Sequence, residues 1–470
     1  MDHLALRTWP SRLVARRWLL AFVPINAATA GFGVVLPLLI LIPLRGSWAD
    51  VAVAATLYNA ILIVASVVWG HLSDRYPFRR AFLVINYAAF AGLYGLLAEV
   101  HSLTVLYAIY AGIGAIAPAG VSASNLLILE KFTEGERPTA FASFQEVSMI
   151  GSLVGLGLGY VWTVGGGTLL VLLAVLAALA LASAFLIQLW VAGGPGRLRT
   201  PSVARHSESL LSRLRPSSVG HSPVPFFPHR PRLGPQPLAR LRRWVGEELH
   251  HELPLVMAAS FLFNLSGNLF NISYTPYLYS VGLAASAIFL VNLGNNFAQT
   301  LVFPTTGGLA NRVGIDRMVQ RATYFRAIGY LATAGFTLVV LTRGASLGAN
   351  LLVYGALGAA IAAYTTASTL MLYRGFAHRD AGGLLGINSA LGGAAAVAGA
   401  GLSGLLAVFG SFRLVFLVSA GLLFVSVPLW AAASVAYERR RTAERAAGRS
   451  TTPPRASGGP VEGPAAAKAP

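Results

Sequence analysis

The sequence predicts an all-α membrane protein built from two six-helix bundles, related by pseudo-two-fold symmetry around a central cavity. One observation is the composition: of 470 residues, 55% are hydrophobic and 11% are charged, whereas soluble domains carry roughly 25% charged residues. The others are a series of long uncharged runs and a repeat that relates the two halves of the chain. Together they disfavour a soluble enzyme, a disordered chain and a secreted domain held by disulfides, which the absence of cysteine excludes outright.

The first half of the chain predicts six membrane-spanning helices, since each such helix needs about 20 mostly apolar residues. Four uncharged runs supply one helix each: 18–44, 51–70, 81–98 and 100–129. The next run, 138–196, contains Glu146 as its only charge, and three glycines at 165–167 divide it into two helices.

The second half of the chain predicts six more helices. The uncharged run 253–311 is too long for one span and is divided at the turn 280–282. The ninth span, 327–342, is short and borrows two residues before it, so we expect Arg326 to snorkel to the membrane interface. The last three spans cover 344–373, 381–412 and 414–437.

The segments outside the spans are rich in Pro, Gly, Ser and Arg, a composition typical of disordered chain. Four apolar residues between 238 and 249 recur at helical spacing, which fits either an amphipathic helix on the membrane surface or a plain helix end. The predicted organisation is an N-terminal arm (1–17), a first bundle (18–191), a linker (192–253), a second bundle (254–437) and a disordered tail (438–470).

The Lys and Arg residues are distributed unevenly over the predicted loops. Because loops alternate between the two sides of the membrane, 32 of the 35 cations fall on the side of both termini and the linker. The other side has Arg45, Arg343 and Arg413. The positive-inside rule therefore places both termini in the cytoplasm. The basic loops lack interleaved aromatic residues, so the charge indicates orientation, and we expect no nucleic-acid partner.

Enzymatic features are missing from the sequence. All nine histidines lie in loops, tails or span ends, at spacings that fit no metal site. There is no Gly-rich phosphate-binding loop of the Gly-x-x-x-x-Gly-Lys type. We therefore expect no enzyme activity, no cofactor and no metal.

Three pairs of matching segments relate the two halves. The stretch Gly-His-Leu-Ser-Asp-Arg at 70–75 is followed 237 residues later by Gly-Gly-Leu-Ala-Asn-Arg at 307–312. YAGIGA at 110–115 matches YGALGA at 354–359, and an Asn precedes a Pro by about three helical turns in both the first and the seventh span. A duplicated six-helix unit joined by a long linker is one plan found in secondary transporters.

Over roughly residues 18–437 the chain resembles the major facilitator superfamily, most specifically through the loop after the second span, which matches motif A of that superfamily. The resemblance implies a monomer in the lipid bilayer of the plasma membrane. It further implies a secondary active transporter that moves a small-molecule organic solute by alternating access, as efflux or uptake, with protons as the coupling ion; an antiporter is one such transporter.

Two alternatives stay open. An uncoupled uniporter is favoured because the fourth span lacks the Arg of the drug/proton antiporter subgroup and the first span lacks an acid. Leu156, where the fifth span of that subgroup has Pro, is a further departure from the subgroup. A non-transporting sensor or scaffold on the same fold is the other, because the Arg-rich linker is long enough to bind a partner.

The motif residues predict a conformational latch. Asp74 can cap a neighbouring helix N-terminus, where the helix dipole favours a carboxylate, and the nearby arginines can pair with Glu130. We expect these contacts to hold the outward-open state and to break when the halves rock; the alternative is that the cations serve topology alone. The predicted latch residues are Gly70, Asp74, Arg75, Arg79, Arg80, Glu130, Gly308, Asn311 and Arg312.

Polar residues inside the spans predict the remaining functional sites. Glu146 is the only acid well inside a span, so it is a proton-coupling site, half of an ion pair, or an interface position without functional consequence. In the superfamily the first, fourth, seventh and tenth spans line the central cavity. The residues carried over are Asn26, Thr29, Asn125, Asn264, Asn268, Asn271, Tyr274, Tyr364 and Thr365.

The predicted cavity lining is uncharged and rich in amides with Tyr, which suits a neutral or amphiphilic organic solute. No Arg or Lys is predicted in mid-membrane, which disfavours a small, multiply charged anion as solute. A further amide stripe at 292–299 on the eighth span fits either cavity lining or hydrogen bonds between helices.

Overall fold

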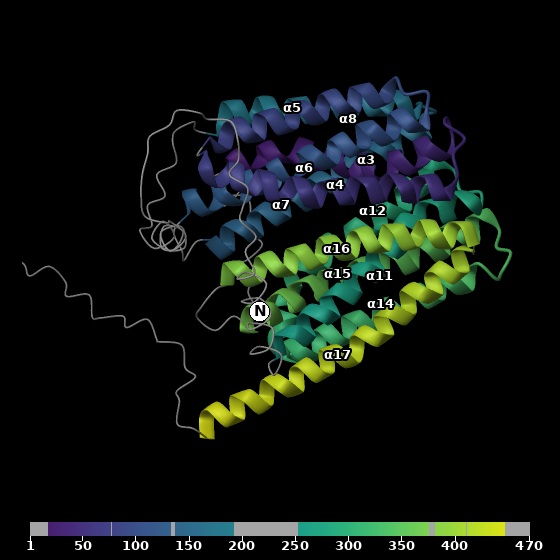
Figure 1. Ribbon diagram of the computed structural model, residues 1–470. Coiled ribbons are helices and arrows are strands. Elements are labelled where there is room, and N and C mark those ends of the chain that lie inside the picture. Colours follow the sequence, from purple (N-terminus) through teal and green to yellow (C-terminus); the bar gives the residue numbers. More distant parts are fainter. Residues whose placement is uncertain are drawn as a thin grey trace, which may run out of the picture.

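The computed structural model describes residues 17–76, 78–132, 137–191, 252–375, 381–409 and 411–446. These residues form helices joined by short turns (Figure 1). The long helices of the first half are α3 (Val23–Leu41), α4 (Trp48–Arg75), α5 (Arg79–Ala98), α6 (Leu103–Lys131), α7 (Arg137–Val164) and α8 (Leu169–Trp190). Those of the second half are α11 (Glu252–Ser280), α12 (Ala285–Val302), α14 (Ile315–Phe336), α15 (Arg343–Gly375), α16 (Ala381–Phe409) and α17 (Phe412–Ala446).

Three short elements complete the described chain. The 3-10 segment η1 (Arg17–Phe22) leads into α3, and η2 (Phe303–Thr305) with α13 (Thr306–Val313) connects α12 to α14. Ten of the long helices are long and apolar enough to span a membrane. The other two are α12, which is rich in amides, and α14, which carries several charges.

Local sequence explains where several helices begin and end. At the start of α4, Ser47 and Asp50 form a capping box, in which the Ser47 backbone N–H donates to the Asp50 carboxylate over 2.6 Å. The turns predicted at 165–167 and 280–282 are confirmed, and each contains a glycine with positive φ, Gly166 at 78° and Gly282 at 79°. Glycine adopts this conformation without the steric cost that a Cβ would bring.

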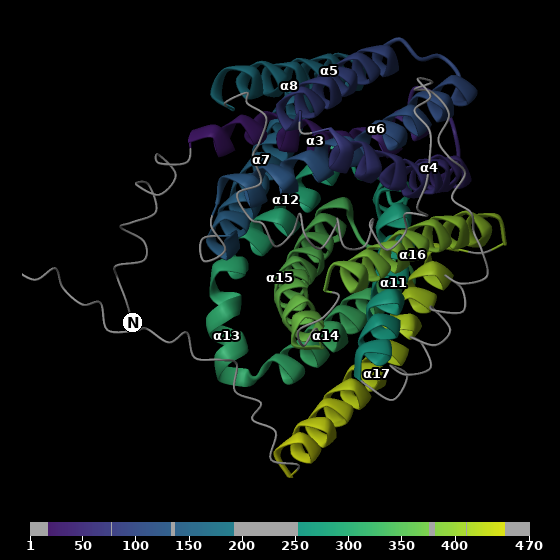
Figure 2. The same ribbon diagram turned by 60° about the vertical axis from the view of Figure 1, so that its left-hand side comes forward.

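The predicted pair of six-helix bundles is confirmed. Helices α3–α8 form one bundle and α11–α17 the other, side by side in both views (Figure 1 and Figure 2). In the first bundle α3 packs on α7, α4 on α6 and α5 on α8; in the second, α11 packs on α16, α12 on α15 and α14 on α17. The order of helices along the chain is the same in both sets, so the repeat in the sequence corresponds to a repeat in packing.

Equivalent glycines allow equivalent helices to approach closely. Gly114 on α6 and Gly358 on α15 occupy the same place in the repeated YAGIGA and YGALGA segments. A Cβ on Gly114 would collide with the backbone carbonyl oxygen of Tyr58 on α4, and one on Gly358 with the backbone carbonyl oxygen of Asn295 on α12. Small residues at such positions let membrane helices pack backbone against backbone.

The two bundles meet along α4 with α16 and along α7 with α12. We call the end of the molecule that carries residues 75, 131, 252 and 446 the terminal end, and the end with the turns near 45, 166 and 282 the distal end. At the distal end the Trp48 ring stacks on Phe412 of the other bundle, with centroids 4.2 Å apart, and Gly159 lies against the Phe289 ring. These contacts join the two halves at the distal end.

The bounds predicted for the eighth and ninth spans are wrong. The eighth span ends at Val302, because Pro304 cannot donate the backbone hydrogen bond that would continue α12. The residues after Val302 form η2 and α13. The ninth helix begins at Ile315, well before the predicted residue 327, and ends at Phe336. The basic stretch before residue 327, expected as a loop, is the first half of α14, since a helix that packs inside the bundle can carry charges on its other faces.

Other boundaries differ less. The last helix, α17, continues to Ala446, and Arg440 on this extension forms an ion pair of 2.9 Å with Glu252, the first residue of α11. That pair extends the second bundle into segments predicted as linker and tail. The predicted N-terminal arm up to residue 16, the linker from 192 to 251 with its amphipathic segment, and the tail from 447 lie outside the described residues.

Candidate substrate cavity

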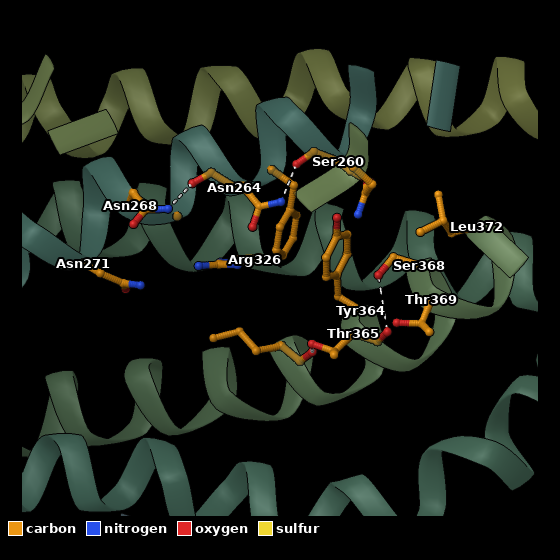
Figure 3. Close-up of a pocket in the computed structure, with 14 residues that line it drawn as sticks. Ser260, Asn264, Asn268, Asn271, Arg326, Tyr364, Thr365, Ser368, Thr369 and Leu372 are labelled. Atoms are coloured by element: carbon orange, nitrogen blue, oxygen red, sulfur yellow. Dashed lines mark hydrogen bonds between the residues drawn. The ribbon is translucent and has the colours of Figure 1, made fainter. Parts of the chain in front are cut away.

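A cavity of about 380 Å³ lies in the second bundle between α11, α14, α15 and α16 (Figure 3). One wall is a polar face of α11, where Ser260, Asn264, Asn268 and Asn271 follow one another at intervals of three or four residues. This spacing places them on one side of a helix. Three of the predicted cavity residues are therefore brought together as expected.

The amides on this face are partly occupied by their own helix. Asn264 donates through Nδ2 to the Ser260 backbone oxygen over 2.8 Å, and Asn268 donates in the same way to the Asn264 backbone oxygen over 2.9 Å. A primary amide has two N–H donors and a carbonyl acceptor, so each of these side chains retains groups that can bind a solute.

The opposite wall comes from α15. Thr365, a predicted cavity residue, is exposed to the cavity, and its hydroxyl donates to the Ile361 backbone oxygen over 2.8 Å, which leaves oxygen lone pairs for a solute. Tyr364 also lines the cavity, but its ring is nearly buried and stacks face to face on Phe263 of α11. The aromatic pair closes one side of the polar chamber.

Arg326 is the main correction to the predicted site. We expected its guanidinium to reach the membrane interface, but Arg326 is only 4% exposed and lines the cavity from the middle of α14. Its Cζ lies 4.4 Å from the centroid of the Phe263 ring, and its Nε donates to the Tyr330 hydroxyl over 2.6 Å. The prediction of a membrane interior without Arg or Lys is therefore wrong, because aromatic faces from two helices hold the cation inside the bundle.

Tyr274 is a second correction. Its side chain is 2% exposed, stacks on Phe270 and donates to Asn350 Oδ1 over 3.1 Å, so it belongs to the packed interior of the second bundle and does not line the cavity. Tyr274 follows Asn271 by three residues, which turns its side chain by about 60° from the polar face at 3.6 residues per turn. That rotation is enough to point it at α15.

The first bundle contains a comparable cavity of about 420 Å³, lined by α3, α4, α5, α6 and α7. The predicted residues Asn26, Thr29 and Asn125 all lie in its wall. The Nδ2 atom of Asn26 donates to the Phe22 backbone oxygen over 2.8 Å, the same bond to the fourth residue before it that Asn264 makes in the second bundle. The rest of the wall is largely aromatic and includes Tyr58 and Phe90.

The central amides of the stripe on α12 hold this helix against α15. Asn295 is 4% exposed and donates through Nδ2 to the Tyr354 backbone oxygen on α15 over 2.7 Å. Gln299 donates to Asn295 Oδ1 over 2.7 Å and so orients that amide. Of the two alternatives open from the sequence, the structure favours hydrogen bonds between helices for this part of the stripe.

The predicted latch residues are divided between the bundles. Arg79 is buried, and its Nε lies 2.9 Å from Glu130 Oε1. Its Nη1 also donates to the backbone oxygens of Ser73 and Tyr76. Because Arg79 and Glu130 lie on α5 and α6 of the same bundle, their ion pair is within one half and does not join the two halves.

The other latch residues lie nearby or on the second bundle. Arg80 donates to the side-chain and backbone oxygens of Gln188 on α8. Gly70 lies in the last turns of α4, whereas the side chains of Asp74 and Arg75 are outside the described part of the structure. In the second bundle the motif copy with Gly308, Asn311 and Arg312 forms the short, exposed helix α13.

Glu146 lies on α7, about two and a half turns from its start at 3.6 residues per turn. Its side chain is half-buried and engaged in contacts with its surroundings. The side chain of Arg137, the cation at the start of α7, is outside the described part of the structure. With Arg326 placed on α14, Glu146 is no longer the only charge inside the predicted spans.

Two pseudo-symmetric six-helix bundles, each with a cavity whose wall includes asparagines, define a membrane transporter fold. The family model of the Major Facilitator Superfamily matches residues 18–342 and 256–463. The chain belongs to this superfamily.

Solved transporter structures share the fold. A nucleoside transporter, NupG, has a TM-score of 0.61 at 13% identity, over 89% of this chain and 98% of that one. An auto-inhibited peptide transporter of the POT family has a TM-score of 0.64 at 12% identity, over 89% and 96% of the two chains. A bacterial homolog of the human lysosomal transporter Spinster, in an inward-facing and unoccupied conformation, has a TM-score of 0.63 at 12% identity, over 90% and 98%. No curated protein sequence matches the chain.

Proposed function

We propose that this protein is a secondary transporter that moves a small organic solute across the membrane by alternating access. The observation that carries the proposal is the position of the cavities relative to the contacts between the halves. The bundles touch through Trp48 and Phe412 at the distal end, whereas the polar residues Asn264 and Thr365 in the terminal-end half of their helices are exposed. A cavity open at one end and closed at the other corresponds to one state of an alternating-access cycle.

The terminal end is proposed to face the cytoplasm. Because Arg326 lies inside the second bundle and not in a loop, the terminal end has one loop cation fewer than the sequence predicts. The Lys and Arg residues of the terminal end still far outnumber those of the distal end, which are Arg45, Arg343 and Arg413. The positive-inside rule then orients the molecule with its open end inward. On this basis the conformation is inward-open.

We propose proton coupling through Glu146. A half-buried carboxylate on a helix that packs at the junction of the two bundles can change its proton occupancy as the halves move. The Arg79–Glu130 pair, by contrast, is proposed to stabilise the first bundle and so to keep the motif loop in place for the latch.

The function is tested with purified full-length protein. Thermal-shift screening of organic solutes selects ligands, and flux of those ligands into proteoliposomes is measured with and without a pH gradient. Saturable flux that a pH gradient accelerates supports a proton-coupled transporter, and flux indifferent to the gradient supports a uniporter. Binding without flux would contradict the proposal. Deleting residues 197–237 separates the scaffold alternative, because the flux of a transporter should tolerate the deletion, whereas the function of a scaffold that uses this linker should not.

Glu146→Gln tests the coupling residue. We expect the variant to bind solute and to transport it without response to a pH gradient, because the amide cannot exchange a proton. Glu438→Gln is the matched control, since Glu438 is an exposed carboxylate on the end of α17. Flux by Glu146→Gln that keeps its full pH dependence would exclude Glu146 as the coupling site.

A further inference from the structure

We propose that the cavity of the second bundle binds the negatively charged group of an organic monoanion, a carboxylate or an equivalent oxyanion, with Arg326 as its counter-charge. The inference rests on the proposed transport function for its biological meaning, but the binding site itself is argued from the cavity alone.

The first step is the state of Arg326. The residue is 4% exposed in the middle of α14, and among the described residues no carboxylate lies within ion-pair distance of it. Its contacts are the π faces of Phe263 and Tyr330 and one hydrogen bond to the Tyr330 hydroxyl. A guanidinium has five N–H donors, so one bond to Tyr330 leaves most of the Arg326 N–H groups without a hydrogen bond to the described residues. Arg326 lines the cavity, where a ligand can accept from these groups. A buried cation in this condition is costly unless a ligand supplies the anion.

The second step is a comparison of the two bundles. Tyr94 on α5 and Tyr330 on α14 occupy equivalent positions, and they stack on the equivalent residues Phe32 and Phe270. Four residues before each tyrosine the first bundle has Phe90 and the second has Arg326. The fold is therefore satisfied by an apolar ring at this position, and the arginine in the second bundle requires an explanation other than packing.

The third step is the space around the guanidinium. Gly267 on α11 faces it, and a Cβ at this position would lie 2.9 Å from Arg326 Nη2. A larger residue would push the guanidinium away from α11. Figure 3 shows Arg326 beside the amide face formed by Asn264, Asn268 and Asn271, so these amides can hydrogen-bond the part of the solute next to its anionic group.

The fourth step is the charge balance. Arg326 is the one charged side chain among the described residues that line this cavity, and the rest of its polar lining is neutral amides and hydroxyls. One cation neutralises one negative charge, so a monoanion leaves the site neutral and a multiply charged anion does not. The Phe263–Tyr364 pair next to Arg326 gives the solute an apolar surface as well.

The test uses the absence of cysteine in the chain. Asn264→Cys places a thiol in this cavity, and Asn26→Cys places the matched thiol in the cavity of the first bundle, since Asn26 and Asn264 are equivalent. Each thiol is modified with a sulfonate-bearing and an ammonium-bearing methanethiosulfonate reagent, and the ratio of the two rates is compared between the cavities. We expect the ratio to favour the sulfonate in the Asn264→Cys variant, and Arg326→Gln to lower it about fivefold or more, because a charge in a partly dehydrated site is weakly screened. Arg326→Lys keeps the charge and should keep the ratio.

Ligand binding is measured in parallel with matched pairs of a carboxylic acid and its primary amide, such as nicotinate with nicotinamide and benzoate with benzamide. We expect an acid to bind more tightly than its amide, and Arg326→Gln to weaken acid binding about tenfold or more while changing amide binding little. Equal binding of acids and amides, or a reagent ratio in the Asn264→Cys variant that is unchanged by Arg326→Gln, would overturn the inference. If no acid or amide binds, the inference stands or falls on whether Arg326→Gln lowers the ratio of the two modification rates in the Asn264→Cys variant.

The two proposals can fail separately. Flux of a neutral solute with no acid preference would retain the transporter and reject the anion site. Arg326-dependent acid binding without flux in proteoliposomes would retain the anion site and reject transport.

Discussion

Phe90 and Arg326 occupy equivalent places in the two bundles, and this single difference changes one aromatic chamber into one with a positive charge. Gly114 and Gly358 illustrate the opposite case, since both halves keep a glycine where a neighbouring backbone passes. At the scale of residues, both halves thus keep a glycine at the helix contact and an asparagine in the cavity wall, Asn26 and Asn264, and they differ in charge at Phe90 and Arg326.

Gly358→Ala tests this packing. The new Cβ would collide with the Asn295 backbone oxygen, so the helices α15 and α12 must separate. We expect the free energy of unfolding to fall by about 1–3 kcal/mol, the usual cost of overpacking. A lower melting temperature of the purified protein would show it. Gly348→Ala is the control, because its added Cβ meets open space; equal melting temperatures for the two variants would contradict the prediction.

At the scale of elements, α12 and α14 are the helices whose composition least resembles a membrane span. Both are accommodated by packing against α15: α12 through the Asn295 hydrogen bond, and α14 through the burial of its inner face around Tyr330. The Asn295 amide is satisfied by the neighbouring helix, whereas Asn292 and Asn296 donate to backbone oxygens of α12 itself. Both arrangements provide the hydrogen bonds that polar groups need in the hydrocarbon interior.

Asn295→Ala should loosen α12 from α15. The side-chain bond to the Tyr354 backbone oxygen is lost, and interhelical hydrogen bonds in membranes are typically worth about 0.6–2 kcal/mol. Chemical denaturation or thermal melting in detergent gives the measurement. Asn292→Ala serves as the control, since Asn292 donates to the Ile288 backbone oxygen of its own helix. A loss of stability as large for Asn292→Ala would mean that the bond between helices is not the cause.

At the scale of the whole molecule, the two bundles are joined at the distal end and expose polar cavity residues toward the terminal end. Alternating access requires the distal contacts to open in the course of the cycle. Trp48 and Phe412 are well placed to report this opening, because they lie on different bundles and stack on each other.

A Trp48→Cys, Phe412→Cys double variant is expected to be cross-linked across the distal end by a bifunctional methanethiosulfonate reagent, because the two native side chains lie against each other. The cross-link should stop transport by holding the distal end closed, and a reductant should restore it. Each single variant controls for loss of the aromatic stack, and the chain has no other cysteine to interfere. Full transport by the cross-linked double variant would show that the distal end does not need to open.

Much of the architecture follows from the sequence. The number of long helices and the turns at Gly166 and Gly282 depend on local properties, since hydropathy and positive φ are set by a few consecutive residues. The duplication is visible because short segments of the two halves match. The polar face of α11 was predictable for the same reason, because helical periodicity alone groups Asn264 with Asn268. The excess of cations on the terminal side is likewise present in the sequence.

The tertiary structure decided which of these polar groups face the cavity. Tyr274 points into the bundle and Asn295 is tied to α15 because those sides of α11 and α12 meet another helix, which periodicity cannot show. Arg326 was predicted at the interface because an isolated arginine in a membrane helix snorkels. It is buried because Phe263, on a helix distant in sequence, and Tyr330 supply aromatic faces for the cation. The sequence by itself determined the number of long helices, because hydropathy is a local property. Only the packing of the helices determined where the buried charge lies, because the aromatic faces around Arg326 come together in the folded bundle.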